Sequence, residues 1–257
     1  MAGHPTDETD AQLATRLAVE AGRLLVRLRE EAEQRHAPSW QMMDAGDAVS
    51  HRFLIEELRS ARPDDAVMSE EGSDDLRRFE RDHCWIVDPL DGTNEYGEHG
   101  RVDWTVHVAL WSEGRLAAGA VSLPAIDAVF STEHPPVVPP MQRPHPRLVT
   151  SRTRNPQSAV VVARALGCDA IRLGSAGAKT MAVILGEADI YVHDGGMYQW
   201  DSAAPIAVAL AAGLHASRLD GSPMAYNHAD PWLPDLIVCR PEFADDALSS
   251  LRAAGWG

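Results

Sequence analysis

The chain has 257 residues, of which 45% are hydrophobic and 24% are charged, a composition typical of a folded protein with one large core or two modest ones. Its formal net charge of −15 predicts repulsion from nucleic acids and from anionic membranes, so we expect neither as a partner. No apolar stretch approaches the roughly 20 residues that span a membrane. Because Met1–Asp10 is polar and has no apolar signal core, we expect a cytoplasmic protein.

The segment that ends at Pro63 predicts two helices packed as a pair. Thr9 can cap a first helix that continues to about Glu33, because apolar residues recur there at helical spacing. A second helix is expected to follow Asp47 and to stop before Pro63.

Short strand patterns come next, and the turn residues between them favour a largely antiparallel sheet. The expected strands are 66–68, 84–87, 104–111, 115–123 and 128–131. Six prolines between Pro135 and Pro146 then interrupt regular structure. We therefore expect an N-terminal α+β lobe, 1–140, that carries most of the candidate metal ligands, and a C-terminal α/β lobe, 141–257, that completes the site and binds substrate.

Beyond this boundary strand and helix patterns alternate, which favours an α/β arrangement. The expected strands lie near 148–149, 171–173, 190–192, 214–217 and 236–239. The expected helices lie near 155–166, 176–185, 202–212 and 241–253.

Acidic residues follow two apolar segments that are typical of buried strands. Glu70 follows the first segment, and the motif Asp88–Thr93 follows the second. A turn at the proline and glycine of this motif would aim Asp88 and Asp91 to one side and expose the carbonyl of Leu90 between them. The alternative is an ordinary surface turn.

Two further aspartates each allow two interpretations. Asp201 precedes the small-residue segment Ser202–Pro205, where a proline fits a first helical turn, and Asp47 precedes the second expected helix. Either aspartate can simply cap a helix, or it can belong to a metal site. Asp44 is a rival to Asp47 for the second role.

Convergence of these acidic residues would imply a metal ion. Like charges held close together raise each other's pKa values unless cations neutralise them. The set is oxygen-only, without His or Cys at ligand spacing, which favours Mg²⁺, Mn²⁺ or Ca²⁺ over zinc. Sharing of aspartates between two ions suits phosphate-ester hydrolysis with Mg²⁺.

Three motifs together resemble the signatures of the inositol monophosphatase superfamily, over about residues 10–240. They are Glu70-Glu71, Asp88–Thr93 and Trp200–Pro205. The continuations Asn94-Glu95-Tyr96 and Gly174–Lys179 are similar to the 3′(2′),5′-bisphosphate nucleotidases of the CysQ type. The resemblance implies an α+β fold, a layered αβαβα sandwich of the sugar-phosphatase type.

The resemblance also implies a site with two to three Mg²⁺ ions. The ligands it implies are Glu70, Asp88, the Leu90 carbonyl, Asp91 and Asp201. Water held by the ions would be the nucleophile, and Asp47 with Thr93 would orient and deprotonate it. Glu70 is an alternative base, and the residues alone do not divide this role.

Lys179 stands out because it is the one lysine among 23 basic residues. A compact ammonium suits a phosphate contact, although chance is the alternative explanation. With the resemblance, the expected substrate contacts are Gly92, Thr93, Ser151, Arg152, Ser175, Lys179 and Asp201.

The activity that the resemblance implies is removal of the 3′-phosphate from adenosine 3′,5′-bisphosphate, with its sulfated relative as a second substrate, in sulfur metabolism. Lithium inhibition and a homodimer are implied in the same way. One alternative keeps the chemistry but acts on inositol or fructose phosphates. Another is a catalytically silent nucleotide-binding protein that keeps the acidic residues.

Overall fold

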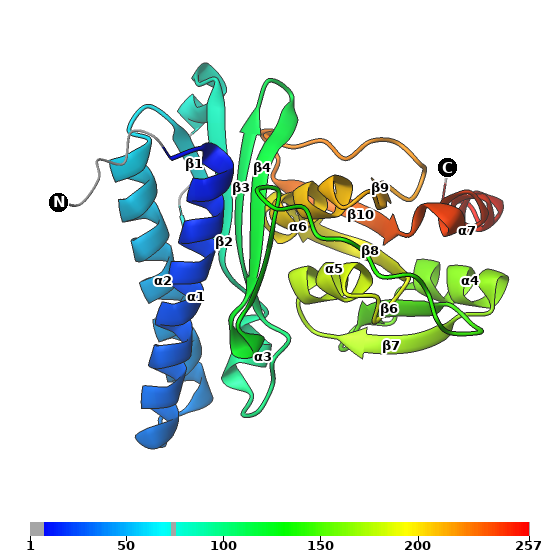
Figure 1. Cartoon of the computed structure of the whole chain (residues 1–257), viewed down its shortest axis with the longest axis horizontal. Helices are drawn as coiled ribbons and strands as arrows, with labels where there is room; N and C mark the ends of the chain where they lie inside the picture. The colour runs from blue at the N-terminus through cyan, green and yellow to red at the C-terminus, as the bar shows by residue number, and fades with distance from the viewer. Residues whose placement is uncertain (1–7, 73–75, 257) are drawn as a thin grey trace.

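The computed structural model describes residues 8–72 and 76–256, which stack in layers of helices and sheets in the order α-β-α-β-α (Figure 1). The outer helices are α1 (Asp10–Gln34) and α2 (Ser39–Ala61) on one side, and α4 (Gln157–Leu166) and α7 (Pro241–Ala253) on the other. Between the two sheets lie α5 (Ala176–Ile184) and α6 (Gln199–Ala211). This arrangement confirms the expected fold class.

The first sheet has the strand order β1-β2-β3-β4-β5. Its strands are β1 (Ala66–Ser69), β2 (His83–Asp91), β3 (Thr105–Ser112), β4 (Arg115–Leu123) and β5 (Ala128–Ser131). The pair β1–β2 is parallel and the other pairs are antiparallel. The sheet is therefore largely antiparallel, as predicted.

The second sheet has the order β7-β6-β8-β10-β9 and is mixed. Its strands are β6 (Arg147–Ser151), β7 (Asp169–Leu173), β8 (Ile190–Tyr198), β9 (His215–Ser217) and β10 (Trp232–Cys239). Three short helices fell outside the sequence prediction, namely α3 (Thr93–Gly97), η2 (Leu76–Glu80) and η3 (Pro124–Ile126).

The first helix begins as expected at Thr9, whose side chain accepts from the N–H of Gln12 while the Gln12 side chain accepts from the N–H of Thr9. The predicted start of α2 after Asp47 is wrong, because α2 begins at Ser39 and places Asp47 in its interior. Gly46 explains the error. Glycine disfavours a helix interior, but a Cβ here would lie 2.8 Å from the Tyr96 ring, so close packing requires the glycine.

The predicted start of α6 at Ser202 is also wrong, since this helix begins at Gln199. Pro205 therefore lies inside the helix and not in its first turn. Because proline has no N–H, the helix lacks the hydrogen bond that residue 205 would otherwise donate to the carbonyl of Asp201. Neighbouring layers bury this helix on most sides, so packing offsets the loss.

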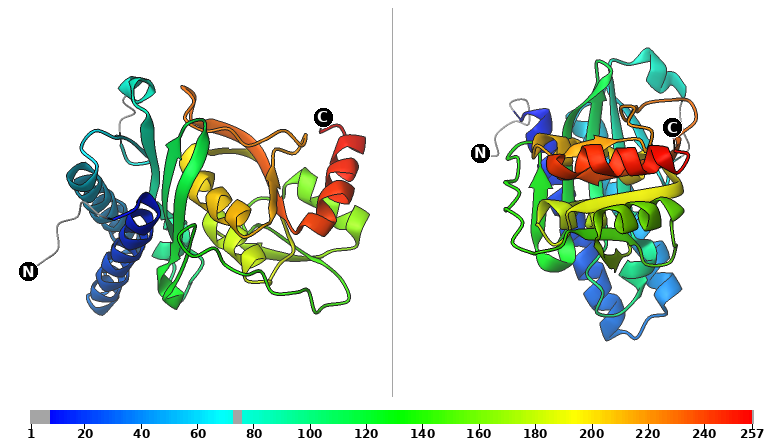
Figure 2. Two further views of the ribbon diagram at one scale, coloured as in Figure 1. Left: turned by 45° about the horizontal axis from the view of Figure 1, so that its top comes forward. Right: turned by 90° about the vertical axis from the view of Figure 1, so that its right-hand side faces the viewer.

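Residues 132–146 connect the two sheets over the surface (Figures 1 and 2). The boundary at residue 140 remains a prediction. Buried side chains of both sheets, such as Ile86 and Val238, belong to one hydrophobic cluster. None of the helices in residues 8–72 and 76–256 combines the length and the hydropathy that a membrane span requires.

Candidate metal centre

A bulge in β2 brings two aspartates to the same side of the first sheet. Residues three apart in a regular strand face opposite sides, but the pairing of β2 with β3 shifts register between Asp88 and Asp91, and such a shift re-aims side chains. The predicted turn at Pro89 is wrong, because the strand continues to Asp91. The chain turns at Gly92, which has φ 90°.

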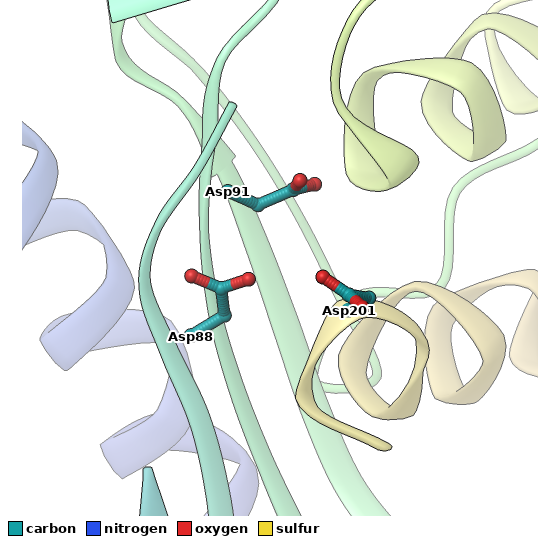
Figure 3. A group of neighbouring side chains, drawn as sticks. All are labelled: Asp88, Asp91 and Asp201. Atoms are coloured by element: carbon teal, nitrogen blue, oxygen red, sulfur yellow. The ribbon is translucent and has the colours of Figure 1, made fainter. Parts of the chain in front are cut away.

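Asp201 approaches the same place from the second half of the chain. It lies in the first turn of α6, and its Oδ2 accepts a hydrogen bond of 2.6 Å from the N–H of Tyr198. Carboxylate oxygens of Asp88, Asp91 and Asp201 all lie within 4.8 Å of one another. Figure 3 shows the three carboxylates turned toward a common centre. Asp201 therefore stabilises the start of a helix and also belongs to the acidic cluster.

The carboxylate of Asp88 is fully buried and only half satisfied. Its Oδ1 accepts from the N–H of Leu90 at 3.0 Å. Among residues 8–72 and 76–256, its buried Oδ2 has no neutral or cationic donor, and the neighbouring side chain that contacts Asp88 is the carboxyl group of Glu70. A buried anionic oxygen without a donor is costly, and a cation at the centre of the cluster would satisfy it. The donor set therefore fits a divalent ion with a preference for oxygen ligands.

The carboxylate of Asp91 is held by the start of α5. Its Oδ2 accepts from the N–H of Gly177 at 2.7 Å, and its Oδ1 accepts from the N–H of Ala176 at 3.2 Å. A helix N-terminus favours negative charge, so this contact orients Asp91. The hydroxyl of Thr105 lies 3.1 Å from Asp91 Oδ2 and 2.9 Å from Nε2 of His107.

Sequence reasoning missed Thr105 and His107. Both are fully buried on β3, and His107 Nδ1 lies 3.1 Å from the carbonyl of Trp200, which accepts its proton. Burial lowers the pKa of His107, and the single hydroxyl proton of Thr105 can be donated either to Asp91 Oδ2 or to the neutral Nε2 of His107. The available signal was two polar residues at alternate positions of a strand that is mostly apolar.

Glu70 directly follows β1 and joins the cluster electrostatically. Desolvation, and then the charge of Asp201, raise the pKa of Glu70 to about 7. Desolvation and then the charge of Asp91 raise that of Asp201 to about 7. Complete burial, followed by the charge of Glu70, raises the pKa of Asp88 well above its usual range. These shifts agree with the predicted mutual repulsion.

Asp47 reaches the site from the interior of α2 and not as a helix cap. The hydroxyl of Thr93 lies 3.4 Å from Asp47 Oδ1 and 3.1 Å from the carbonyl oxygen of Leu90. Desolvation, with the charge of Glu71 as the next cause, raises the pKa of Asp47 to about 7. Its rival Asp44 is exposed on the same helix. The structure thus brings Asp47 to Thr93.

Two of the predicted substrate residues lie in the first turns of α5. Ser175 caps this helix by accepting from the N–H of Ala178 at 2.9 Å. Lys179 is only 3% exposed, donates to the carbonyl of Gly174 and lies over the ring of Tyr191. Burial lowers the pKa of Lys179 to about 8, although the charge of Asp91 opposes this effect.

Two further predicted substrate residues, Ser151 and Arg152, follow each other at the end of β6. The hydroxyl of Ser151 accepts from the N–H of Arg154 at 3.2 Å. The guanidinium of Arg152 forms ion pairs of 2.7 Å with both Glu95 and Glu98, so it connects the second sheet to α3. The predicted Gly92 borders this region, since a Cβ on it would lie 2.9 Å from Cβ of Ser175.

Residues 6–252 match the model of the inositol monophosphatase family. A 3′-phosphoadenosine 5′-phosphate phosphatase of Mycobacterium leprae is 44% identical over 262 residues, 95% of this chain and 94% of the relative. The 3′(2′),5′-bisphosphate nucleotidase CysQ of Escherichia coli K12 is 31% identical over 74% of this chain and 81% of its own. A solved structure of CysQ from Bacteroides thetaiotaomicron covers 92% of this chain and 99% of its own, with a TM-score of 0.77 and 24% identity.

Proposed function

The chain belongs to the inositol monophosphatase family, and from this premise we propose that it is a phosphatase that removes the 3′-phosphate of adenosine 3′,5′-bisphosphate. The observation that carries the proposal is 44% identity, over 95% of the chain, with a phosphatase named for that substrate. The cluster of Asp88, Asp91 and Asp201 supports it, because paired divalent ions held by carboxylates are a common means of phosphate-ester hydrolysis.

The cofactor we propose is Mg²⁺, with two to three ions in the site. The proposed ligands are Glu70, Asp88, the Leu90 carbonyl, Asp91 and Asp201. When bound, the ions supply a reactive water at neutral pH and neutralise charge on the phosphate. The protein contributes a rigid frame, since β2 fixes Asp88 and the first turn of α5 fixes Asp91.

Thr93 and Asp47 are the proposed pair that removes a proton from the attacking water. The hydroxyl of Thr93 can donate to Asp47 while its oxygen accepts a proton from water. An acceptor works best with a pKa near the working pH, and the pKa of Asp47 is raised to about 7. Glu70, whose pKa is also raised to about 7, is the alternative base.

The proposed substrate contacts divide by position. Gly92, Thr93 and Asp201 adjoin the acidic cluster, where the scissile phosphate would bind. Ser175 and Lys179 lie behind Asp91 on α5, and their polar atoms already bond to the backbone. Ser151 and Arg152 border the site at the end of β6. In this structure the charge of Arg152 is neutralised by Glu95 and Glu98.

We propose further features by resemblance to the family. They are inhibition by lithium, a role in sulfur metabolism, hydrolysis of 3′-phosphoadenylyl sulfate as a second activity, a cytoplasmic location and a homodimer.

A substrate panel tests the activity. Phosphate release with Mg²⁺ is compared for adenosine 3′,5′-bisphosphate, 3′-phosphoadenylyl sulfate, inositol 1-phosphate and fructose 1,6-bisphosphate, with a chelator and Asp201→Asn as controls. The expected result is the highest kcat/KM for the bisphosphorylated nucleotide and no release in either control. A clear preference for inositol phosphate would contradict the proposal that adenosine 3′,5′-bisphosphate is the substrate. Nucleotide binding without turnover would indicate a silent binding protein.

A further inference from the structure

Two half-exposed aromatic residues lie on paired strands, and one of them directly precedes the helix that carries Asp201. Tyr198 and Trp232 are 47% and 48% exposed and are register partners on β8 and β10, so their side chains project from the same face of the sheet. The N–H of Tyr198 donates to Asp201 Oδ2 at 2.6 Å. One member of the aromatic pair is therefore in direct contact, through its backbone, with a proposed metal ligand.

Both rings are held in place while part of each remains open. The ring of Tyr198 stacks on Trp200, with centroids 4.9 Å apart and an interplanar angle of 16°. The indole of Trp232 lies against the backbone of Gly196, where an added Cβ would be 2.4 Å from Nε1 of Trp232. Rings fixed on one side can stack a planar ligand at little entropic cost.

A positively charged side chain, that of Arg154, contacts the backbone of the same Gly196. Nη1 of the exposed Arg154 donates to the carbonyl of Gly196 at 3.2 Å. In the part of the chain that the structure describes, no carboxylate lies within ion-pairing distance of Arg154, in contrast to the doubly paired Arg152. In a chain with a net charge of −15, this unpaired guanidinium is suited to an anion.

We infer that Tyr198 and Trp232 bind the base of a nucleotide substrate and that Arg154 binds the phosphate that is not hydrolysed. The inference rests on the proposed function and specifies which parts of the substrate the protein recognises. An aromatic surface stacks on any base but offers little to a cyclitol or a sugar phosphate. The subsite therefore separates nucleotides from inositol and fructose phosphates that the same metal cluster could otherwise hydrolyse.

The inference is tested with three substrates that lose first the second phosphate and then also the base. Adenosine 3′,5′-bisphosphate has the base and the second phosphate, adenosine 3′-monophosphate lacks the second phosphate, and glycerol 2-phosphate lacks both. The variants are Tyr198→Leu, Trp232→Leu and Arg154→Gln. Matched controls are Trp40→Leu on α2 and Arg164→Gln on α4, both exposed and on helices of the outer layers.

Loss of either aromatic ring should lower kcat/KM about tenfold for both nucleotides, and leave glycerol 2-phosphate unchanged. Arg154→Gln should lower it about tenfold for the bisphosphate alone. The control variants should match the wild type. Equal losses on all three substrates would mean a merely structural role, and no loss on the nucleotides would also overturn the inference.

Calorimetric binding of adenosine 5′-monophosphate separates this inference from the activity. If the wild type binds this nucleotide and Trp232→Leu does not, the subsite is supported even when no nucleotide is hydrolysed, and only the proposed function fails. If the wild type hydrolyses the bisphosphate but all three variants bind and turn over as it does, the function stands and the subsite is wrong. Absence of binding to the wild type contradicts the subsite.

Discussion

The carboxylate of Asp91 accepts a hydrogen bond of 2.7 Å from the backbone N–H of Gly177, and this contact joins β2 of the first sheet to the helix layer between the sheets. The residue proposed as a metal ligand is thus also a structural link. Changes at either end of this bond should therefore affect the fold and the chemistry together.

Asp91→Asn should reduce kcat/KM more than about 100-fold, because substitution of residues that merely support metal ligands already costs 10- to 100-fold. It should also destabilise the metal-free protein by about 1–3 kcal/mol, since the amide leaves one helix N–H poorly paired. Steady-state kinetics and urea unfolding check the two effects. Retention of full activity would contradict the proposed site.

Gly177→Ala should destabilise the protein by about 1–3 kcal/mol through overpacking. The new Cβ would lie 2.2 Å from Nε2 of His107 and 2.4 Å from the hydroxyl of Thr105, and both side chains are buried. Thermal unfolding measures the loss. Gly72→Ala, whose Cβ would make only ordinary contacts at 3.5 Å, is the stability control, and equal melting temperatures would contradict the packing described.

Thr93→Val should reduce kcat by about 100-fold or more, because it removes the hydroxyl between the water and Asp47. Thr93→Ser keeps that hydroxyl and should retain most of the activity. If the two residues act as one relay, Asp47→Asn should lower kcat similarly, and the double variant should lose little more. Asp44→Asn on the exposed face of α2 should leave kcat unchanged. Additive losses would favour Glu70 as the base.

The stability of the metal-free protein should fall as pH rises from about 4 to 7. The pKa values of Asp47, Glu70 and Asp201 are raised to about 7 in the folded state, so the folded chain binds more protons than the unfolded chain in this window. Added Mg²⁺ should therefore raise the melting temperature more at pH 8 than at pH 5.

Calorimetry with chelator or with Mg²⁺ at both pH values measures this difference. Asp88→Asn removes the most deeply buried carboxyl group of the cluster and its repulsion of Glu70, so it should stabilise the metal-free protein at pH 8 and reduce the gain from Mg²⁺. A Mg²⁺ effect that does not change with pH would contradict the cluster of raised pKa values.

Lys179→Met tests the predicted phosphate contact of the buried ammonium. A direct contact to the second phosphate predicts about a tenfold higher KM for adenosine 3′,5′-bisphosphate than for the wild type, with a smaller change for adenosine 3′-monophosphate. Equal losses on both substrates would show that Lys179 acts through Gly174 and the start of α5.

Local sequence signals predicted the elements whose causes are local. Thr9 and the apolar periodicity located α1, and the acidic residues after apolar segments located the cluster. Gly46 and Pro205 misled the prediction of α2 and α6, because both residues disfavour a helix interior and yet lie inside these helices at buried positions. No local rule anticipates that Tyr96 needs the space above Gly46.

In the site, too, some features follow from local sequence and others depend on contacts between distant residues. The spacing of Asp88 and Asp91 suggested a turn, and only the pairing with β3 reveals a bulge. Thr105 and His107 belong to the site because β3 pairs with β2, where they are the register partners of Asp91 and Asp88. The aromatic pair depends on cross-strand register between Tyr198 and Trp232, which the sequence pattern does not specify.

The division of the acidic cluster between β2 and α6, on either side of the connection 132–146, also has a consequence for truncated products. A fragment that ends within 132–146 would keep Asp88 and Asp91 but lose Asp201, and it would expose the apolar face that α6 covers. Incomplete translation or proteolytic cleavage there would yield an inactive species prone to aggregation. Reassembly from two separate pieces would have to restore both the hydrophobic core and the acidic cluster.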